Sequence, residues 1–201
     1  ISLINLNKIK VILTERSSIS ELKYSNNVIN KFKNKLIYFL AKILYKFSDL
    51  IITNSKFEKN YIQNKFQLNN IICIHPPSIE NIIKIKFNNK IYKKIINIIY
   101  VGRLSREKGI FVILKALKNI NKKYRFIFNL YGEGPERKSI EKFVKINGLS
   151  KTIFLKGFVS NKKLIFKNAD LFINASLWEG LPNALVQSIN YNVFPICSDA
   201  P

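Results

Sequence analysis

Residues 169–199 read ADLFINASLWEGLPNALVQSINYNVFPICSD, a stretch that predicts a strand, a turn, a helix and a second strand. Pro182 stands where the helix begins, because its fixed φ suits the first turn and its missing N–H is not needed there. Asn192 tolerates the left-handed conformation that ends a helix. The expected elements are strands 171–174 and 193–197, with a helix over 183–191 between them. Such a unit is typical of a parallel sheet crossed by helices.

The turn of this stretch, residues 179–183, is a candidate anion site. A strand that runs into a helix presents backbone N–H groups and the positive end of the helix dipole. Glu179 stands at the mouth of this turn. Because a carboxylate repels phosphate, we expect Glu179 to contact hydroxyl groups beside the anion.

The same alternation of strands and helices extends over the rest of the chain. The further expected strands are 8–14, 50–53, 71–74, 95–101, 125–131 and 152–155, and the further helices are 31–47, one capped by Ser55 and Glu58, 108–119, 136–147 and 161–168. The expected fold class is α/β, with two Rossmann-like parallel-sheet half-domains in residues 1–77 and 95–201, joined by a linker in 78–94. The chain has no Met and its last residue is Pro, so we expect both half-domains to be truncated.

Parallel sheets bind ligands beyond the carboxyl ends of their strands, and two cations follow the expected strand 95–101. Arg103 and Lys108 lie where a helix begins, and the helix dipole disfavours positive charge there unless an anion is bound. Gly102 lets a ligand approach the backbone. The alternative is that these are ordinary loop charges solvated by water.

These motifs resemble those of the group-one glycosyl transferases, retaining enzymes of the GT-B fold that use nucleotide sugars. Ser176, Glu179, Gly180 and Pro182 match the family pattern Ser-x-x-Glu-Gly-x-Pro. The family carries a second Glu eight positions after the first, where this chain has Gln187.

The resemblance implies a role for each motif. Arg103 and Lys108 would hold the diphosphate of the donor, and Glu179 the hydroxyls of the transferred sugar; these three are the expected catalytic residues. The other expected donor-binding residues are Gly102, Phe158, Gly180, Leu181, Pro182, Asn183, Ala184 and Gln187. Residues 95–201 would then be the donor-binding domain, and residues 1–77 the C-terminal half of the acceptor-side domain.

Some nearby residues have two interpretations. Phe158 either stacks on the nucleobase or fills the core of its loop. Trp178 either walls the sugar pocket or packs under the turn. Glu133 is a weaker site candidate, and Asp170 is expected to anchor the start of a strand.

We expect no metal site and no cofactor, the nucleotide sugar being a co-substrate. The chain has three Asp, no Asp-x-Asp pair and one His. Fixed cations and backbone N–H groups can take up the charge of a leaving diphosphate in place of a metal ion.

The net charge of +22 comes mainly from Lys spread along the whole chain. It indicates a solvated surface, or a basic face that attracts lipid head groups or nucleotide phosphates; nucleic-acid binding favours clustered Arg and is not expected. The helix 31–47 has Leu36, Leu40, Ile43 and Phe47 on one face, which either packs on the sheet or lies on an anionic bilayer. The two Cys lie in apolar runs and indicate a reducing compartment. We expect a cytoplasmic protein. Peripheral attachment of this protein to the inner face of the cell membrane is a further expectation.

Three functions follow from these features. The first is a glycosyltransferase that moves a sugar from a UDP- or GDP-linked donor to a saccharide or lipid-linked acceptor, in bacterial cell-surface polysaccharide synthesis. The second is a catalytically silent relative that binds a nucleotide sugar, which Gln187 favours. The third is a nucleic-acid-binding module, which only the charge favours.

Overall fold

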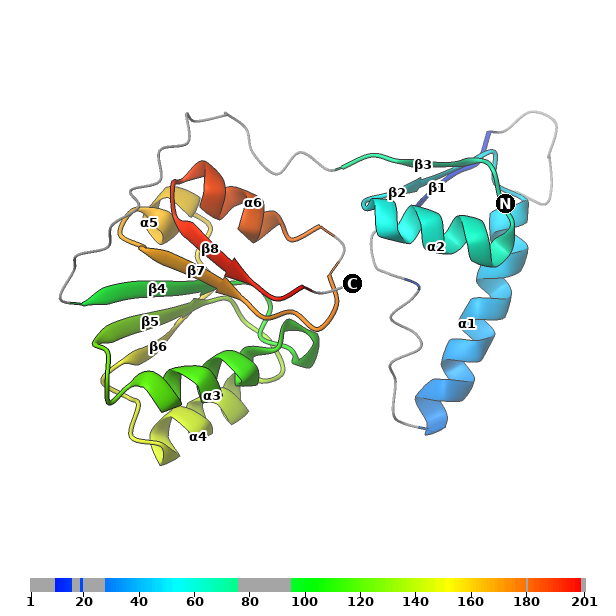
Figure 1. The fold of residues 1–201 in the computed structure, drawn as a ribbon. Coiled ribbons are helices and arrows are strands. Elements are labelled where there is room, and N and C mark those ends of the chain that lie inside the picture. The colour runs from blue at the N-terminus through cyan, green and yellow to red at the C-terminus, as the bar shows by residue number, and fades with distance from the viewer. Residues whose placement is uncertain (1–9, 16–18, 20–27, 76–94, 180, 200–201) are drawn as a thin grey trace. The chain divides into compact units, whose positions relative to one another are not determined.

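The computed structural model describes residues 10–15, 19, 28–75, 95–179 and 181–199 (Figure 1). The described residues form two compact units. The first holds residues 10–75 together with Glu179 and Leu181, and the second holds 95–178 and 182–199. The linker expected at 78–94 lies outside the described residues, as does Gly180.

The second unit is built on a five-stranded sheet in which every pair of neighbouring strands is parallel. The strands lie in the order β6-β5-β4-β7-β8. Their bounds are Ile96–Val101 (β4), Phe126–Tyr131 (β5), Ile153–Gly157 (β6), Leu171–Asn174 (β7) and Phe194–Cys197 (β8). All five strands expected in this region are confirmed to within two residues at each end.

Helices cover both faces of this sheet, α3 and α4 on one side and α5 and α6 on the other (Figure 1). The helices are Ile110–Ile120 (α3), Arg137–Ile146 (α4), Lys162–Phe166 (α5) and Asn183–Asn190 (α6), and a 3-10 helix, η2, spans Arg106–Lys108. Ile98 packs in the core under α3 and α4, while its neighbour Ile99 packs in the core under α5 and α6. The strand β4 is therefore buried on both sides, as a central parallel strand requires.

The first unit has three parallel strands in the order β1-β2-β3 and two helices. The elements are Ile12–Glu15 (β1), Val28–Lys46 (α1), Leu50–Thr53 (β2), Lys56–Phe66 (α2) and Ile71–Cys73 (β3). Ile51 and Ile71 point into the core with residues of α1 and α2. On the other face of the sheet, Ile12 and Ile72 are exposed.

Helix α1 packs through a face that the sequence did not predict. Tyr38, Ala41 and Tyr45 contact the core of the first unit. The Tyr45 hydroxyl donates to Glu15 Oε2 at 2.5 Å, and the ring of Tyr45 meets that of Phe66 edge-on with centroids 5.5 Å apart. Burying an aromatic ring while its hydroxyl is bonded satisfies both parts of the side chain.

The expectation that Leu36, Leu40, Ile43 and Phe47 pack on the sheet is therefore wrong for the described structure. All four are exposed, on the side of the helix opposite to Tyr45. The sequence pattern predicted this face because only Leu, Ile and Phe were counted as core residues, whereas the tyrosines Tyr38 and Tyr45 face the core.

Two smaller predictions in the first unit are tested. Ser55 caps α2, since its hydroxyl accepts from the Glu58 backbone N–H at 3.1 Å. The carboxylate of Glu58 is buried and accepts from the Ile19 N–H at 2.8 Å, a contact that the capping pattern did not predict. The strand expected from residue 8 begins at Ile12 within the described residues.

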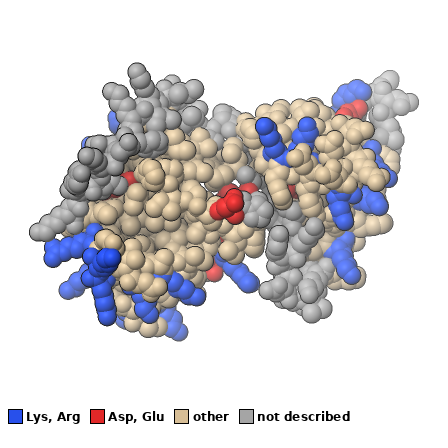
Figure 2. Space-filling model, viewed as in Figure 1, with Lys and Arg blue, Asp and Glu red and all other residues tan. Residues whose placement is uncertain are grey.

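Lys and Arg lie on both units in the view of Figure 2, and on the second unit they gather at the lower left, toward α3 and α4. Their presence on both units agrees with the spread of Lys along the sequence.

Candidate active site

The topology of the second sheet selects one position for a ligand. From β4 the chain proceeds to β5 and β6 on one side, and then returns to place β7 and β8 on the other. Open parallel sheets bind ligands where the strand order reverses in this way, outside the carboxyl ends of the strands. The loop Gly102–Gly109 follows β4 and the turn from Ala175 follows β7. Two of the segments selected from the sequence thus flank the switch point.

Backbone hydrogen bonds tie the loops at this edge to one another. They connect the loop after β4 with those after β5 and β7, and the loop after β5 with the end of β6. The bonds run from Gly102 N to Tyr131 O (3.0 Å), Leu104 N to Glu133 O (2.9 Å), Gly132 N to Gly157 O (2.7 Å) and Leu177 N to Glu107 O (2.7 Å). The edge is therefore a preorganised frame, which is what a binding site for a charged transition state needs.

Two glycines allow this close approach of backbones. Gly109 has φ +61°, and a Cβ at this position would lie 1.9 Å from the carbonyl oxygen of Ala175. Gly132 has φ +141°, and a Cβ there would lie 1.9 Å from the carbonyl oxygen of Gly102. Any side chain at either position would push the loops apart.

The loop after β4 carries both cations that the sequence singled out. Arg103 is exposed, and its carbonyl accepts a 2.8 Å hydrogen bond from the hydroxyl of the buried Tyr100. Lys108 is half-buried at the end of η2, directly before Gly109, the N-cap of α3. The structure therefore fixes the backbone of Arg103 and places Lys108 at a helix N-terminus.

Glu136, an acid that was not singled out from the sequence, is hydrogen-bonded to this loop. The Glu136 N–H donates to the Leu104 carbonyl at 2.9 Å, and Glu136 Oε2 is buried with no hydrogen-bond partner among the described residues. Burial raises the pKa of Glu136, the charge of Glu107 raises it further, and Arg106 opposes them. Glu107 in turn accepts from the hydroxyl of Ser105.

The sequence places two carboxylates, Glu133 and Glu136, in the turn after β5. Only the first of them, Glu133, was named as a site candidate from the sequence. Glu133 is exposed and forms an ion pair with Arg137 at 2.6 Å, which is an ordinary pair on a helix surface.

Side-chain hydrogen bonds hold the turn after β7. The hydroxyl of the buried Ser176 donates to Asn174 Oδ1 at 2.8 Å, and the Ser198 hydroxyl donates to the Ser176 carbonyl at 2.7 Å. Asp170 anchors the start of β7, as expected, because its carboxylate accepts from the Asn97 N–H at 2.9 Å.

Helix α6 carries the remaining donor-site candidates. Pro182 is its N-cap, one position earlier than the first-turn place the sequence suggested. Asn183 and Gln187 lie one turn apart on the same face of α6. The Ala184 side chain packs against the core, so its contribution to a ligand would come from its backbone N–H.

Other candidates lie as follows. Phe158 is 79% exposed, so the interpretation that it fills the core of its loop is wrong, while base stacking stays a prediction. Trp178 is half-buried. Glu179 and Leu181 are half-buried and group with the first unit, and the convergence of Glu179 with Arg103 and Lys108 stays a prediction.

Nowhere in the described residues do three or more His, Cys, Asp or Glu side chains gather as metal ligands would. None of the described helices combines the length and the apolar character that crossing a bilayer requires.

The second unit is thus a doubly wound α/β domain whose switch point is flanked by a cation-bearing, glycine-dependent loop, the architecture of a nucleotide-binding domain. Residues 81–201, more than half of the chain, match the family model described as "Glycosyl transferases group 1". The chain belongs to this family.

Known relatives agree with this assignment. An uncharacterized glycosyltransferase of Methanocaldococcus jannaschii is 28% identical over 99% of this chain and 52% of its own length. A Campylobacter jejuni enzyme named N-acetylgalactosamine-N,N'-diacetylbacillosaminyl-diphospho-undecaprenol 4-alpha-N-acetylgalactosaminyltransferase is 27% identical over 96% of this chain and 52% of its own. The chain spans about half the length of these curated relatives.

Solved structures share the fold. Anabaena HepE in complex with UDP and glucose aligns with a TM-score of 0.72 and 16% identity, over 99% of this chain and 55% of that one. The lipopolysaccharide outer core galactosyltransferase WaaB aligns with a TM-score of 0.65 and 17% identity, over 99% and 59%. These neighbours are GT-B glycosyltransferases, and the expected α/β, GT-B-like fold class is confirmed.

Proposed function

We propose that the protein is a retaining glycosyltransferase that moves a sugar from a UDP- or GDP-linked donor to a saccharide or lipid-linked acceptor, in the synthesis of a bacterial cell-surface polysaccharide. The observation that carries this proposal is the loop Gly102–Gly109, tied by backbone bonds into the switch point of a doubly wound sheet. Two further facts support it: the Campylobacter relative is named for a diphospho-undecaprenol substrate, and Anabaena HepE binds UDP and glucose.

The chemistry requires stabilisation of a leaving nucleoside diphosphate. In the proposal, Arg103 and Lys108 face the two phosphates, and the N–H groups at the start of α6, around Asn183 and Ala184, add partial positive charge. Fixed donors aimed at growing charge are worth about 10²- to 10³-fold each in rate. These groups would do the work of a metal ion, so the proposed reaction is metal-independent.

The remaining site residues would orient the donor. Glu179 holds the hydroxyls of the transferred sugar, with Gly180, Leu181 and Pro182 forming the turn beside it. Gln187 faces the ribose, Phe158 stacks on the base, and Gly102 lets the diphosphate approach the backbone. Retention of configuration would follow if the acceptor attacks from the side that the phosphate leaves.

The proposal is tested by titrating the protein with UDP and with GDP in a thermal-shift experiment. A ligand that binds only the folded state, present at a free concentration of 100 times its Kd, raises the free energy of unfolding by about 2.7 kcal/mol. The double variant Arg103→Ala, Lys108→Ala should lose this response. A wild-type protein that responds to neither nucleotide would contradict the proposal.

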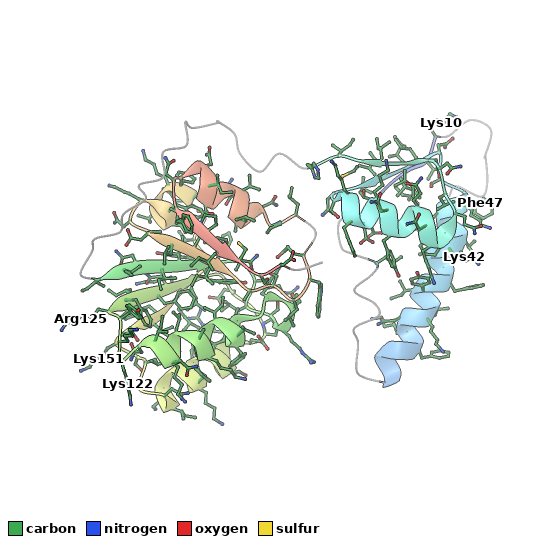
Figure 3. All side chains as sticks on the ribbon, viewed as in Figure 1. Lys10, Lys42, Phe47, Lys122, Arg125 and Lys151 are labelled. Carbon is green, nitrogen blue, oxygen red and sulfur yellow. The ribbon has the colours of Figure 1, made fainter. Side chains whose placement is uncertain are left out.

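A matched control removes the same charge from the opposite edge of the sheet. Lys122 and Arg125, labelled in Figure 3, lie in the loop after α3 and directly before β5. The variant Lys122→Ala, Arg125→Ala should keep the full response to nucleotide. Equal losses in both double variants would mean that net charge, and not the loop Gly102–Gly109, attracts the ligand.

The silent relative is the second candidate, and Gln187 is the observation that favours it. A Glu179→Gln variant should bind UDP or GDP normally and lose sugar transfer if the protein is an enzyme. A wild-type protein that binds the nucleotide but neither transfers nor hydrolyses a nucleotide sugar, and gains turnover on Gln187→Glu, would support the silent relative.

We also propose that the enzyme works at the inner face of the cell membrane, where a lipid-linked acceptor would be presented. Nucleic acid is no partner in this proposal, because the Lys residues are spread along the whole sequence and are not clustered in one segment.

A further inference from the structure

Helix α1 has two apolar faces on opposite sides. Its inner face, Tyr38, Ala41 and Tyr45, packs on the core of the first unit. Successive residues of an α-helix turn by about 100°, so residues that follow Phe32 at steps of three and four lie opposite that inner face. We call this set the outer stripe: Phe32, Leu36, Phe39, Leu40 and Ile43, with Phe47 directly after the helix.

The outer stripe is exposed along its whole length. Its six side chains have exposed fractions between 38% and 76%. The four core-facing residues of α3 in the second unit, Ile110, Ile113, Leu114 and Leu117, are by contrast all buried. A single exposed apolar residue needs no explanation, but a contiguous patch of large ones marks an interaction surface.

The charges beside the outer stripe have a single sign. Residues 28–46 contain five Lys and no Asp or Glu. Lys33, Lys35, Lys42 and Lys46 are exposed. By the same helical spacing, Lys35, Lys42 and Lys46 follow one margin of the outer stripe, and on its other side Lys33 lies between Leu40 and the exposed Ile37 and Leu44. Lys42 and Phe47 are labelled on this part of the molecule in Figure 3.

We propose that the outer stripe of α1 docks on an anionic lipid bilayer, with Phe32 and Phe39 inserted at the interface and the flanking lysines on the head groups. Aromatic and aliphatic residues on one face with Lys at its margins are the features of a helix that lies in the plane of a membrane. A protein partner would bury the apolar residues, but a bilayer with anionic lipids provides an apolar phase and a negative surface together.

This inference extends the proposed place of work of the enzyme and rests on α1 alone. It assigns the acceptor-side unit, and not the donor-binding unit, as the part that contacts the membrane. Its failure would leave the binding of UDP or GDP unchanged, so the two proposals can fail separately.

The test is flotation of the protein with vesicles of phosphatidylcholine and with vesicles that also contain phosphatidylglycerol. The wild-type protein should float with the anionic vesicles. The double variant Phe32→Ser, Phe39→Ser should bind the anionic vesicles more weakly than the wild type by a factor of roughly ten or more. The reason is that two large apolar side chains no longer leave water on binding. The variant Lys35→Gln, Lys42→Gln, Lys46→Gln should lose roughly 100-fold, about fivefold for each lysine near a charged surface.

A matched control substitutes two exposed apolar residues on other helices. Val112 on α3 and Ile146 on α4 are exposed, and the variant Val112→Ser, Ile146→Ser should float like the wild type. All variants replace exposed side chains, so circular dichroism and the response to UDP or GDP should match those of the wild type.

Three outcomes would overturn the inference. The first is a wild-type protein that does not float with anionic vesicles. The second is an outer-stripe variant that floats as well as the wild type. The third is a wild-type dimer in light scattering that the outer-stripe variant dissociates while lipid binding is unaffected; the outer stripe would then be an interface between two copies.

Discussion

Two pairs of consecutive isoleucines show how the two units differ. Ile98 and Ile99 in β4 point to opposite faces of the second sheet and both are buried. Ile71 and Ile72 in β3 point to opposite faces of the first sheet, and Ile71 is buried while Ile72 is 39% exposed. An apolar run in a parallel strand predicts burial on both faces. In the described part of the first unit, only one face of β3 is buried in this way. In the second unit, both faces of β4 are buried.

The carboxyl edges of the two sheets also differ. In the second unit, backbone N–H and carbonyl groups tie neighbouring loops directly. In the described part of the first, side chains join the ends of β2 and β3 beside the backbone bond from Ile74 N to Thr53 O (2.9 Å): the Thr53 hydroxyl donates to the Ile72 carbonyl at 3.3 Å, and the His75 imidazole pairs with the Asn54 carbonyl at 2.9 Å. A backbone frame resists displacement but excludes any added Cβ. We therefore expect the edge of the second unit to tolerate substitution poorly at the glycines where backbones meet.

The largest expected effect is that of Gly109→Ala. The added Cβ would lie 1.9 Å from the Ala175 carbonyl oxygen, at a residue whose φ is +61°. We expect the free energy of unfolding of the second unit to fall by about 4 kcal/mol, through left-handed strain and displaced backbone. Urea denaturation followed by the fluorescence of Trp178 measures it.

Gly148→Ala separates strain from crowding. Gly148 has φ +66°, but a Cβ there meets nothing within 4 Å. Its substitution should cost only about 1 kcal/mol, the conformational part alone. Similar costs at the two glycines would show that the loop edge is less tightly framed than the backbone bonds indicate.

The second prediction concerns the isoleucines themselves. Ile99→Ala should lower the free energy of unfolding of the second unit by about 3 kcal/mol, because it leaves a cavity between the sheet and α5 and α6. Ile72→Ala should change the stability of the first unit by less than about 0.5 kcal/mol. Hydrogen exchange read by mass spectrometry reports on each unit separately. A cost at Ile72 as large as that at Ile99 would mean that the outer face of the first sheet is covered in solution.

Much of the second unit was predictable because its signals are local. The apolar spacing of Ile110, Ile113, Leu114 and Leu117 identifies both α3 and its buried face. Asn192, expected to end α6, indeed has a left-handed φ of 59°. Periodicity and turn chemistry act over a few residues, so one sequence is enough to show them.

What failed depends on contacts that are distant along the chain. The inner face of α1 includes Tyr45, whose hydroxyl donates a hydrogen bond to Glu15, 30 positions earlier in the chain. Glu136, whose Oε2 is buried, is hydrogen-bonded through its N–H to the carbonyl of Leu104, on the loop after a different strand. The strand order that brings these segments together cannot be read from periodicity, and neither residue was singled out.

The smallest expected effect is a gain of stability on Glu136→Gln. Burial first, and the charge of Glu107 second, raise the pKa of Glu136 above its ordinary 4.5. The folded state therefore holds this proton more tightly than the unfolded state does. The stability that this carboxyl contributes is fully present below pH 4.5 and is lost as the pH rises through the folded-state pKa.

Above the folded-state pKa, the charge on the Glu136 carboxylate thus opposes folding of the second unit, and an uncharged amide of the same shape removes that cost. We expect Glu136→Gln to stabilise the second unit at pH 7 by less than about 1 kcal/mol, and to flatten the decline of stability above pH 4.5. Glu133→Gln in the same turn is the matched control, since it breaks an exposed ion pair with Arg137 and should give no gain. Urea denaturation at a series of pH values measures both variants. A loss of stability at pH 7 in Glu136→Gln would show that this carboxylate holds the loop Gly102–Gly109 through its charge, and the backbone frame would then not act alone.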